Sequence, residues 1–167
     1  DVYKRQNDGY PLPDNIVIQW WNYRGHKDLA LRNALRHHYP VICSTNYYTY
    51  LNFPLTPWKG YEQARTFDLK DVYIDNPSYK ATQESNPLIR GMGCALWTDD
   101  GVKEYMIDRR LFPRILALAE QMWHNGPLTD FDTFYQRILH KKEWFENRGY
   151  GFGPALTEET DNNYKWE

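Results

Sequence analysis

The sequence predicts an α/β fold built on a small parallel sheet. Three short apolar runs, at residues 16–21, 41–44 and 91–97, alternate with segments whose apolar residues recur at helical spacing. This alternation is typical of parallel sheets, because each crossover helix covers a face of the sheet. Three strands cannot close a barrel. The chain is therefore either a small open sheet or the last three β/α units of an eight-unit barrel.

The composition is that of a folded domain, and it argues against several classes of partner. The 167 residues are 41% hydrophobic and 25% charged, with a net charge of −2 and no basic block. Nucleic acid and anionic membrane surfaces are therefore poor partners. No apolar run reaches the ~18 residues of a membrane helix. Aromatic residues make up 17% of the chain, a content that suits contact with carbohydrate or a protein interface. The chain opens on Asp1 without a Met, and we expect a fragment of a longer protein.

The first helix is expected over residues 27–38, between the first two strands. Its inward stripe at 3, 4 and 7 spacing consists of Leu31, Ala34, Leu35 and His38, and Pro40 ends it. A long connection over residues 53–88 follows the second strand, with a short helical turn expected near residues 59–65. A connection of this length usually carries function or elements of its own.

Further helices are expected after the third strand. A helix over residues 100–110 precedes one that begins near Pro113, since proline suits the first turn of a helix. The predicted buried stripe of this second helix is Ile115, Leu118, Ala119 and Met122. The last helix is capped by Thr129 or Asp130, faces Phe131, Phe134, Ile138 and Phe145 inward, and stops at Gly149.

Aromatic and polar residues follow all three predicted strands. They are Trp20 and Trp21 after the first, Tyr47, Tyr48, Tyr50 and Asn52 after the second, and Trp97, Asp99 and Asp100 after the third. The carboxyl ends of parallel strands share one edge of the sheet, where sites are built. An indole beside a carboxylate suits a sugar, whose C–H face stacks on the ring while its hydroxyls bond the acid. A purely structural rim of aromatic residues is the alternative explanation.

Other candidate sites are weak, and no metal or cofactor is expected. Cys43 and Cys94 lie in apolar runs without metal-ligand spacing, and two buried thiols are favoured over a disulfide. His37 and His38 are neighbours on a predicted helix, so their side chains point in different directions. The glycines of residues 149–153 follow a helix and do not open one, which excludes a nucleotide-binding loop.

Three segments together resemble the C-terminal part of the catalytic barrel of family 20 glycoside hydrolases, the β-N-acetylhexosaminidases. Residues 18–21 are similar to the sixth barrel strand. Residues 41–52 are similar to the seventh, whose family pattern ends in Tyr-Leu-Asp. Residues 91–99 and the Phe-Pro-Arg to Trp run at 112–123 are similar to the eighth strand and its helix. The resemblance implies a partial TIM (β/α)₈ barrel over residues 1–156, containing strands six to eight with a long loop after strand seven, and then a polar tail over 157–167.

The resemblance also implies substrate-assisted retaining hydrolysis of terminal β-linked N-acetylhexosamine. The substrate's own 2-acetamido oxygen attacks the anomeric carbon, an exception to the two-carboxylate scheme. The family's Asp-Glu pair, which supplies the acid, follows the fourth barrel strand, and no Asp-Glu dipeptide occurs at any strand end here. We therefore expect the chain to supply the acetamido and sugar-stacking side of the site and to be inactive alone. The alternatives are a non-catalytic carbohydrate-binding module, an acid-less barrel fragment, or a half-barrel that self-associates.

The resemblance assigns roles in the sugar site to individual residues. Tyr50 corresponds to the catalytic tyrosine whose hydroxyl bonds the acetamido oxygen, and Trp97 to the tryptophan on which the sugar stacks. Trp21 corresponds to a wall of the acetamido pocket, or Trp20 if the register slips by one residue.

Two positions depart from the family pattern. Asn52 stands where the family has Asp, and Asp99 where it has Glu. Both family residues bind the sugar's outer hydroxyls, so these changes bear on sugar preference and favour a substituted or epimeric hexosamine. By resemblance, N-acetylhexosamine-containing glycans are the expected partners, and a secreted or periplasmic location is expected.

Overall fold

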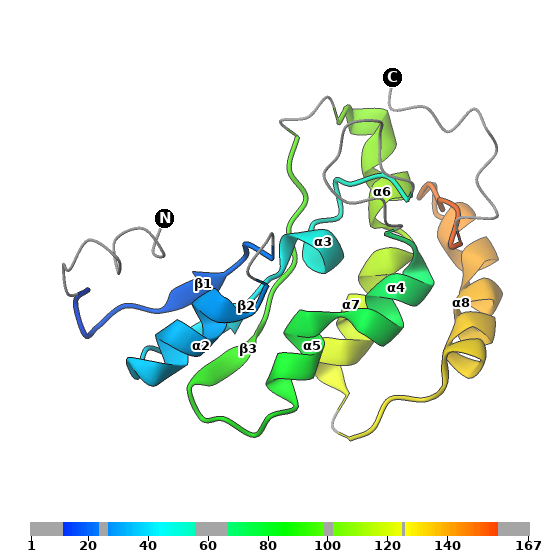
Figure 1. Ribbon diagram of the computed structural model, residues 1–167. Helices are drawn as coiled ribbons and strands as arrows, with labels where there is room; N and C mark the ends of the chain where they lie inside the picture. Colours follow the sequence, from blue (N-terminus) through cyan, green and yellow to red (C-terminus); the bar gives the residue numbers. More distant parts are fainter. Residues whose placement is uncertain (1–11, 24–26, 56–66, 99–101, 125, 157–167) are drawn as a thin grey trace.

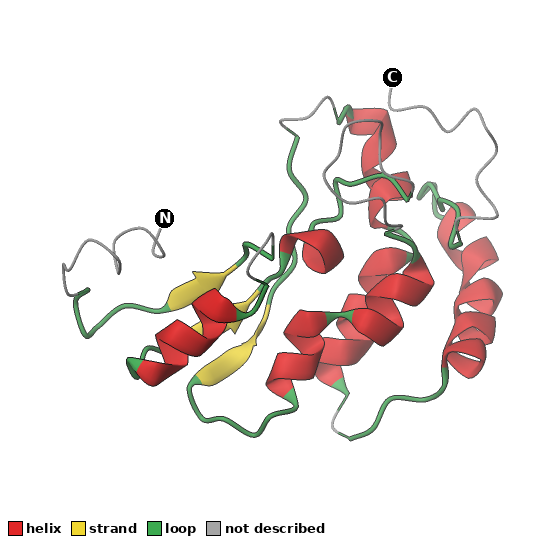
Figure 2. Ribbon diagram, in the orientation of Figure 1, coloured by secondary structure: helices red, strands yellow, loops and turns green. Residues whose placement is uncertain are grey.

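The computed structural model describes residues 12–23, 27–55, 67–98, 102–124 and 126–156, and it has an α/β fold with a small parallel sheet (Figure 1). Its strands are β1 (Ile18–Trp20), β2 (Val41–Cys43) and β3 (Ile89–Met92). Its helices are α2 (Leu29–Arg36), α3 (Asn46–Thr49), α4 (Leu69–Asp75), α5 (Pro77–Thr82), α6 (Ile107–Leu111), α7 (Arg114–Trp123) and α8 (Phe131–Glu146), with a short 3₁₀ turn at Glu104–Met106. Figure 2 shows the strands gathered at one side of the molecule and the helices α4 to α8 at the other.

The sheet has the order β1-β2-β3, and both pairs of neighbouring strands are parallel, as predicted. All three strands are shorter than the apolar runs that predicted them. The third differs most, because it begins at Ile89, two residues before the predicted start, and ends at Met92. Residues 93–97 continue beyond it, and of these Ala95 forms an isolated parallel bridge with Tyr50. The apolar run therefore contains the strand and its continuation toward the site.

The sheet buries one face against α2. Side chains alternate between the faces of a strand. The core on the covered face consists of Ile18, Trp20, Leu31, Ala34, Val41, Cys43 and Ala81. Gln19 and Ile42, which point to the other face, are exposed. Parallel sheets are covered on both faces in complete α/β domains. Among the described residues, this sheet is covered on one.

Helix α2 confirms Leu31 and Ala34 as inward residues, but the prediction for His38 is wrong. His38 is exposed and lies beyond the end of the helix with a φ of +60°. Its N–H donates to the Leu35 carbonyl, and the Tyr39 N–H donates to that of Ala34, at 3.1 and 3.0 Å. These are the bonds of a Schellman motif, which turns the chain out of the helix at this residue.

The connection over residues 53–88 contains two helices, α4 and α5, that the sequence analysis did not predict. The side chain of Asp68 caps α4, and that of Asn76 caps α5, each by accepting a backbone N–H of the first turn. Pro77 occupies the start of α5, where its missing N–H costs nothing. The turn expected near residues 59–65 lies outside the described residues.

Helix α7 starts directly after Pro113, as predicted, but its buried stripe differs from the prediction. The buried residues are Arg114, Ala117, Leu118 and Gln121, whereas Met122 is exposed and Ile115 and Ala119 are half-buried. Two of the buried side chains are polar and bond to backbone carbonyls. Leu118 is buried as predicted, but periodicity that counts only apolar residues placed the rest of the stripe one residue too far along the helix. The preceding helix, α6, is also shorter than the predicted 100–110, of which residues 100 and 101 are not described.

Helix α8 lies on the side of the molecule opposite the sheet, where it packs against α4 (Figure 1). Asp130, one of the two predicted caps, accepts the Thr133 N–H at 2.9 Å. Phe134 and Ile138 are buried, and the Phe134 ring stacks on Tyr73 of α4 at a centroid distance of 4.1 Å. The helix ends at Glu146, and Gly149 follows with a φ of +83° that suits glycine.

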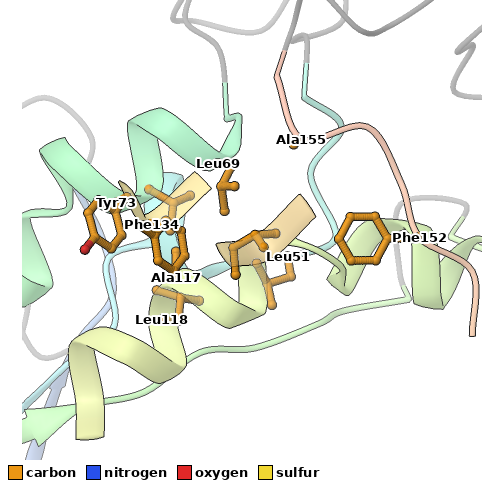
Figure 3. Packing of buried hydrophobic residues seen from close by; sticks show 10 residues of the cluster. Leu51, Leu69, Tyr73, Ala117, Leu118, Phe134, Phe152 and Ala155 are labelled. Atoms are coloured by element: carbon orange, nitrogen blue, oxygen red, sulfur yellow. The ribbon is translucent and has the colours of Figure 1, made fainter. Parts of the chain in front are cut away.

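Residues 151–155, the strap, run back from α8 across the starts of α7 and α4. Phe152 and Ala155 close the core over Leu51, Leu69 and Ala117 (Figure 3). The strap is fixed by backbone bonds, from the Gly153 N–H to the Phe112 carbonyl at 3.1 Å and from the Leu69 N–H to the Ala155 carbonyl at 2.9 Å. The glycine-rich segment therefore has a packing role.

Both cysteines are free, so no disulfide links the second and third strands. Cys43 is buried as expected, but the expectation of a buried thiol is wrong for Cys94, which is exposed. Across the described part of the chain, no helix combines the length and apolar character needed to span a membrane.

Gly153→Ala is expected to destabilise the protein. A Cβ at this residue would overlap the Arg109 carbonyl oxygen, which is backbone and cannot rotate away. We expect the free energy of unfolding to fall by about 1–3 kcal/mol, the usual range for overpacking. Gly151→Ala is the matched control, because its Cβ would meet the flexible Arg109 side chain at 3.0 Å. Urea unfolding measures both variants, and equal midpoints would contradict the prediction.

Candidate active site

The candidate site is built where the three strands end, at their shared carboxyl edge. Backbone pairing continues past the strands, from the Ser44 N–H to the Trp20 carbonyl and from the Asn46 N–H to the Trp21 carbonyl, both at 2.8 Å. On the other side of β2, the Gly93 N–H donates to the Cys43 carbonyl at 2.9 Å. These bonds hold the segments that follow the strands side by side.

Helix α3 is a single buried turn that delivers the next residue, Tyr50, to this edge. Its polar side chains are satisfied locally. The Asn46 Oδ1 accepts the Tyr23 N–H at 3.0 Å, and the Thr49 hydroxyl donates to the Thr45 carbonyl at 3.1 Å. Buried polar groups that bond in this way fix the geometry of the turn that carries them. The position of Tyr50 is therefore set by a well-ordered turn.

Tyr50 and Trp97 come from different strand ends and meet in space. Their ring centroids lie 5.9 Å apart at 55°, with Tyr50 half-buried and Trp97 48% exposed. Burial raises the pKa of the Tyr50 hydroxyl, and the neighbouring Trp97 side chain acts in the opposite direction. A phenol is protonated at neutral pH at its ordinary pKa of about 10, and the upward shift leaves it so, which makes Tyr50 a hydrogen-bond donor. The pair thus combines a donor with an accessible indole face.

The two neighbouring tryptophans of the first strand end have opposite surroundings. Trp20 is 3% exposed, packs in the core beneath α2, and points its Nε1 toward the Lys27 carbonyl at 3.4 Å. Trp21 is 41% exposed. An indole that fills a core cannot also stack on a ligand, so Trp21 is the accessible candidate for a pocket wall. Its role there stays a prediction.

Asn52 lies two residues beyond Tyr50 and is buried. It is 2% exposed, and its Oδ1 has no hydrogen-bond partner among the described residues. An unsatisfied buried acceptor costs about 1–3 kcal/mol, so such groups call for an explanation. An amide oxygen is also an acceptor for a hydroxyl. The geometry is compatible with the predicted hydroxyl ligand and does not test it.

Two further candidates, Asp99 and Asp100, lie outside the described residues, so their predicted role is untested. His37 and His38 are exposed at the far end of α2, and no group of three His, Cys, Asp or Glu in the described segments could hold a metal ion.

Sequence reasoning missed two residues that shape the site. The Phe53 ring lies nearly parallel to that of Tyr50, with centroids 6.4 Å apart. Arg114 reaches from α7 to the carbonyls of Leu51 and Phe53. The sequence feature that could have pointed to Arg114 is the Phe-Pro-Arg run at 112–114. It places an arginine at the start of a helix that has no acidic residue in its first turn.

Comparisons with known proteins agree on the family. The family model for the catalytic domain of glycosyl hydrolase family 20 matches residues 1–126. A crystal structure of a β-N-acetylhexosaminidase from Bacteroides fragilis is 72% identical, with a TM-score of 0.86 over 95% of this chain and 32% of that one. The β-hexosaminidase subunit beta of Felis catus is 28% identical over 92% of this chain and 27% of its own length. A family 20 enzyme from Streptomyces coelicolor shares the fold at 23% identity, with a TM-score of 0.71.

The chain spans about a third or less of the length of these relatives, since it covers 32% of the Bacteroides chain and 27% of the cat subunit. The match begins at the first residue of the chain and ends before α8, so the sheet and the strand-end edge fall within it. The resemblance expected from residues 18–21, 41–52 and 112–123 is confirmed. The chain belongs to glycosyl hydrolase family 20, as part of its catalytic domain.

Proposed function

We propose that the complete protein removes terminal β-linked N-acetylhexosamine from glycans, and that this chain forms the acetamido and sugar-stacking side of its active site. The observation that carries the proposal is the Tyr50–Trp97 pair at the carboxyl edge of the sheet. A protonated phenol beside an open indole face matches a sugar that carries an acetamido group. The family membership supplies the class of reaction.

The proposed architecture is a partial barrel, in which β1, β2 and β3 are strands six, seven and eight. Their parallel order and the single covered face support it. The uncovered face carries Gln19 and the exposed Ile42, as one face of a sheet does when the rest of a barrel packs against it. Residues 1–156 are assigned to this segment, and residues 157–167 to a polar tail.

The proposed reaction is substrate-assisted and retaining. The acetamido oxygen of the substrate attacks the anomeric carbon, the bond to the leaving oxygen breaks, and an acid elsewhere in the barrel protonates that oxygen. The Tyr50 hydroxyl donates a hydrogen bond to the attacking oxygen and holds it in line. The resulting oxazolinium is opened by water, which restores the acetamido group and retains the anomeric configuration.

The other site residues bind the sugar. Trp97 stacks on the sugar's C–H face, and its 48% exposure leaves room for that contact. Trp21 forms a wall of the acetamido pocket. Asn52 and Asp99 are assigned to the outer hydroxyls by the resemblance. The glycan substrate is the proposed partner, and a secreted or periplasmic location follows from the resemblance.

Tyr50→Phe in the complete hydrolase is expected to lower kcat by about 10²-fold, the usual effect of removing one hydrogen-bond donor to a developing charge. KM should change much less, because the hydroxyl acts mainly as charge develops. Steady-state kinetics on a chromogenic N-acetylglucosaminide give both constants. Tyr79→Phe is the control, since it removes a hydroxyl from α5 that has no role in the proposal. Equal, small effects of the two variants would mean that Tyr50 only packs.

The 167-residue chain alone is expected to show no turnover of the same substrate. Its sequence has no Asp-Glu pair at a strand end, and among the described residues one face of its sheet is uncovered. The complete hydrolase at equal concentration is the positive control, and sedimentation reports whether isolated chains pair to cover the open sheet. Turnover by the chain at the rate of the complete protein would contradict the assignment. A complete protein that binds the sugar without turnover would favour the carbohydrate-binding alternative.

A further inference from the structure

One buried guanidinium joins α7 to the segment that carries the site. Arg114 is 2% exposed, although it is the first residue of the helix. Its Nη2 lies 2.9 Å from the Leu51 carbonyl oxygen and 2.7 Å from that of Phe53. The Arg110 carbonyl accepts from the same nitrogen at 2.8 Å, and the Phe67 carbonyl from Nη1 at 3.1 Å. All four acceptors are backbone oxygens.

An arginine is unfavourable at this place by the local rules of helix formation. The first turn of a helix carries partial positive charge, which repels a cation. Burying a charged group is costly unless hydrogen bonds satisfy it. The four carbonyls satisfy it here. Only arginine offers a planar fork of five donors that is charged at any working pH, whereas lysine concentrates its charge on a single nitrogen.

Two of these carbonyls, those of Leu51 and Phe53, belong to the turn that directly follows Tyr50. The same turn is held from its other side, because the Leu51 N–H donates to the Ala95 carbonyl at 2.7 Å and the Ala95 N–H donates to that of Thr49 at 2.9 Å. The backbone at Tyr50 is thus fastened between the continuation of β3 and the guanidinium of α7. Asn52 lies between the two carbonyls that Arg114 binds.

We propose that Arg114 is a positioning residue for the sugar site, which sets the placement of Tyr50 through the turn at residues 51–53. The inference rests on the proposed function of Tyr50. Loss of the fork releases one side of the turn, and a displacement of about 1 Å at a reacting group can cost about 10²-fold in rate. The effect of Arg114 on the reaction therefore passes through Tyr50.

A double-mutant cycle in the complete hydrolase tests this route. Arg114→Lys keeps the charge, but its shorter side chain ends in a single ammonium that cannot also reach the Phe67 carbonyl bound by Nη1, and kcat should fall by at least about tenfold. In a Tyr50→Phe background the same change should lower kcat by less than about twofold, because residues that act as one unit are not additive. Arg114→Gln, which keeps amide donors, replaces the lysine variant in the cycle if the latter does not fold.

Phe134→Leu separates positioning from stability. This residue is buried between α8 and α4, in the same core as Leu51 but outside the hydrogen bonds that hold the turn, and the smaller side chain should lower the unfolding temperature while kcat stays at the parent value. The proposal is overturned if Arg114→Lys leaves kcat within about twofold of the parent, or if its loss is undiminished in the Tyr50→Phe background. A Tyr50→Phe variant with parental kcat would instead refute the proposed function itself.

Discussion

The site depends on backbone pairing that resumes after an interruption. β2 and β3 stop, the single turn of α3 intervenes on one side, and parallel pairing resumes where Tyr50 lies opposite Ala95. Parallel pairing fixes register, so it decides which residue of the α3 segment lies beside the run that leads to Trp97. The two site rings therefore meet because of the sheet, and their own attraction is secondary. The other contacts of the candidate site depend on this pairing of Tyr50 with Ala95.

Polar groups of α7 fix what apolar packing leaves adjustable. Gln121 donates to the carbonyls of Val72 and Tyr73 and accepts from the Asn76 amide, at 2.8–3.0 Å. Arg114 lies in the first turn of the helix and Gln121 in the last, so both ends of α7 are hydrogen-bonded to backbone oxygens. Hydrophobic contacts are not directional and tolerate small shifts, whereas these bonds weaken steeply when distance or angle changes. The helix therefore holds α4 and the Tyr50 turn in a defined relation.

Sequence reasoning succeeded where chemistry depends on local order along the chain. The strand-end positions of Tyr50 and Trp97 followed from apolar runs that end in aromatic residues, and the cap at Asp130 followed from its side chain. It failed where tertiary bonds decide. The inward face of α7 contains Arg114 and Gln121, whose burial depends on carbonyls about 50 to 60 residues away in the chain. No periodicity of apolar residues reports such partners.

The contrast between Trp20 and Trp21 shows how one residue of register decides which of two indoles is accessible. In a pleated strand, neighbours point to opposite faces, so only one of the two indoles can join the core under α2. Trp20 does so, which directs Trp21 to the face that also carries Gln19. That face is the uncovered one. A pocket wall on it needs an opposite wall from other strands, and this requirement is met by a barrel and not by an open three-stranded sheet. The accessible tryptophan and the uncovered face are thus two consequences of the same pleat.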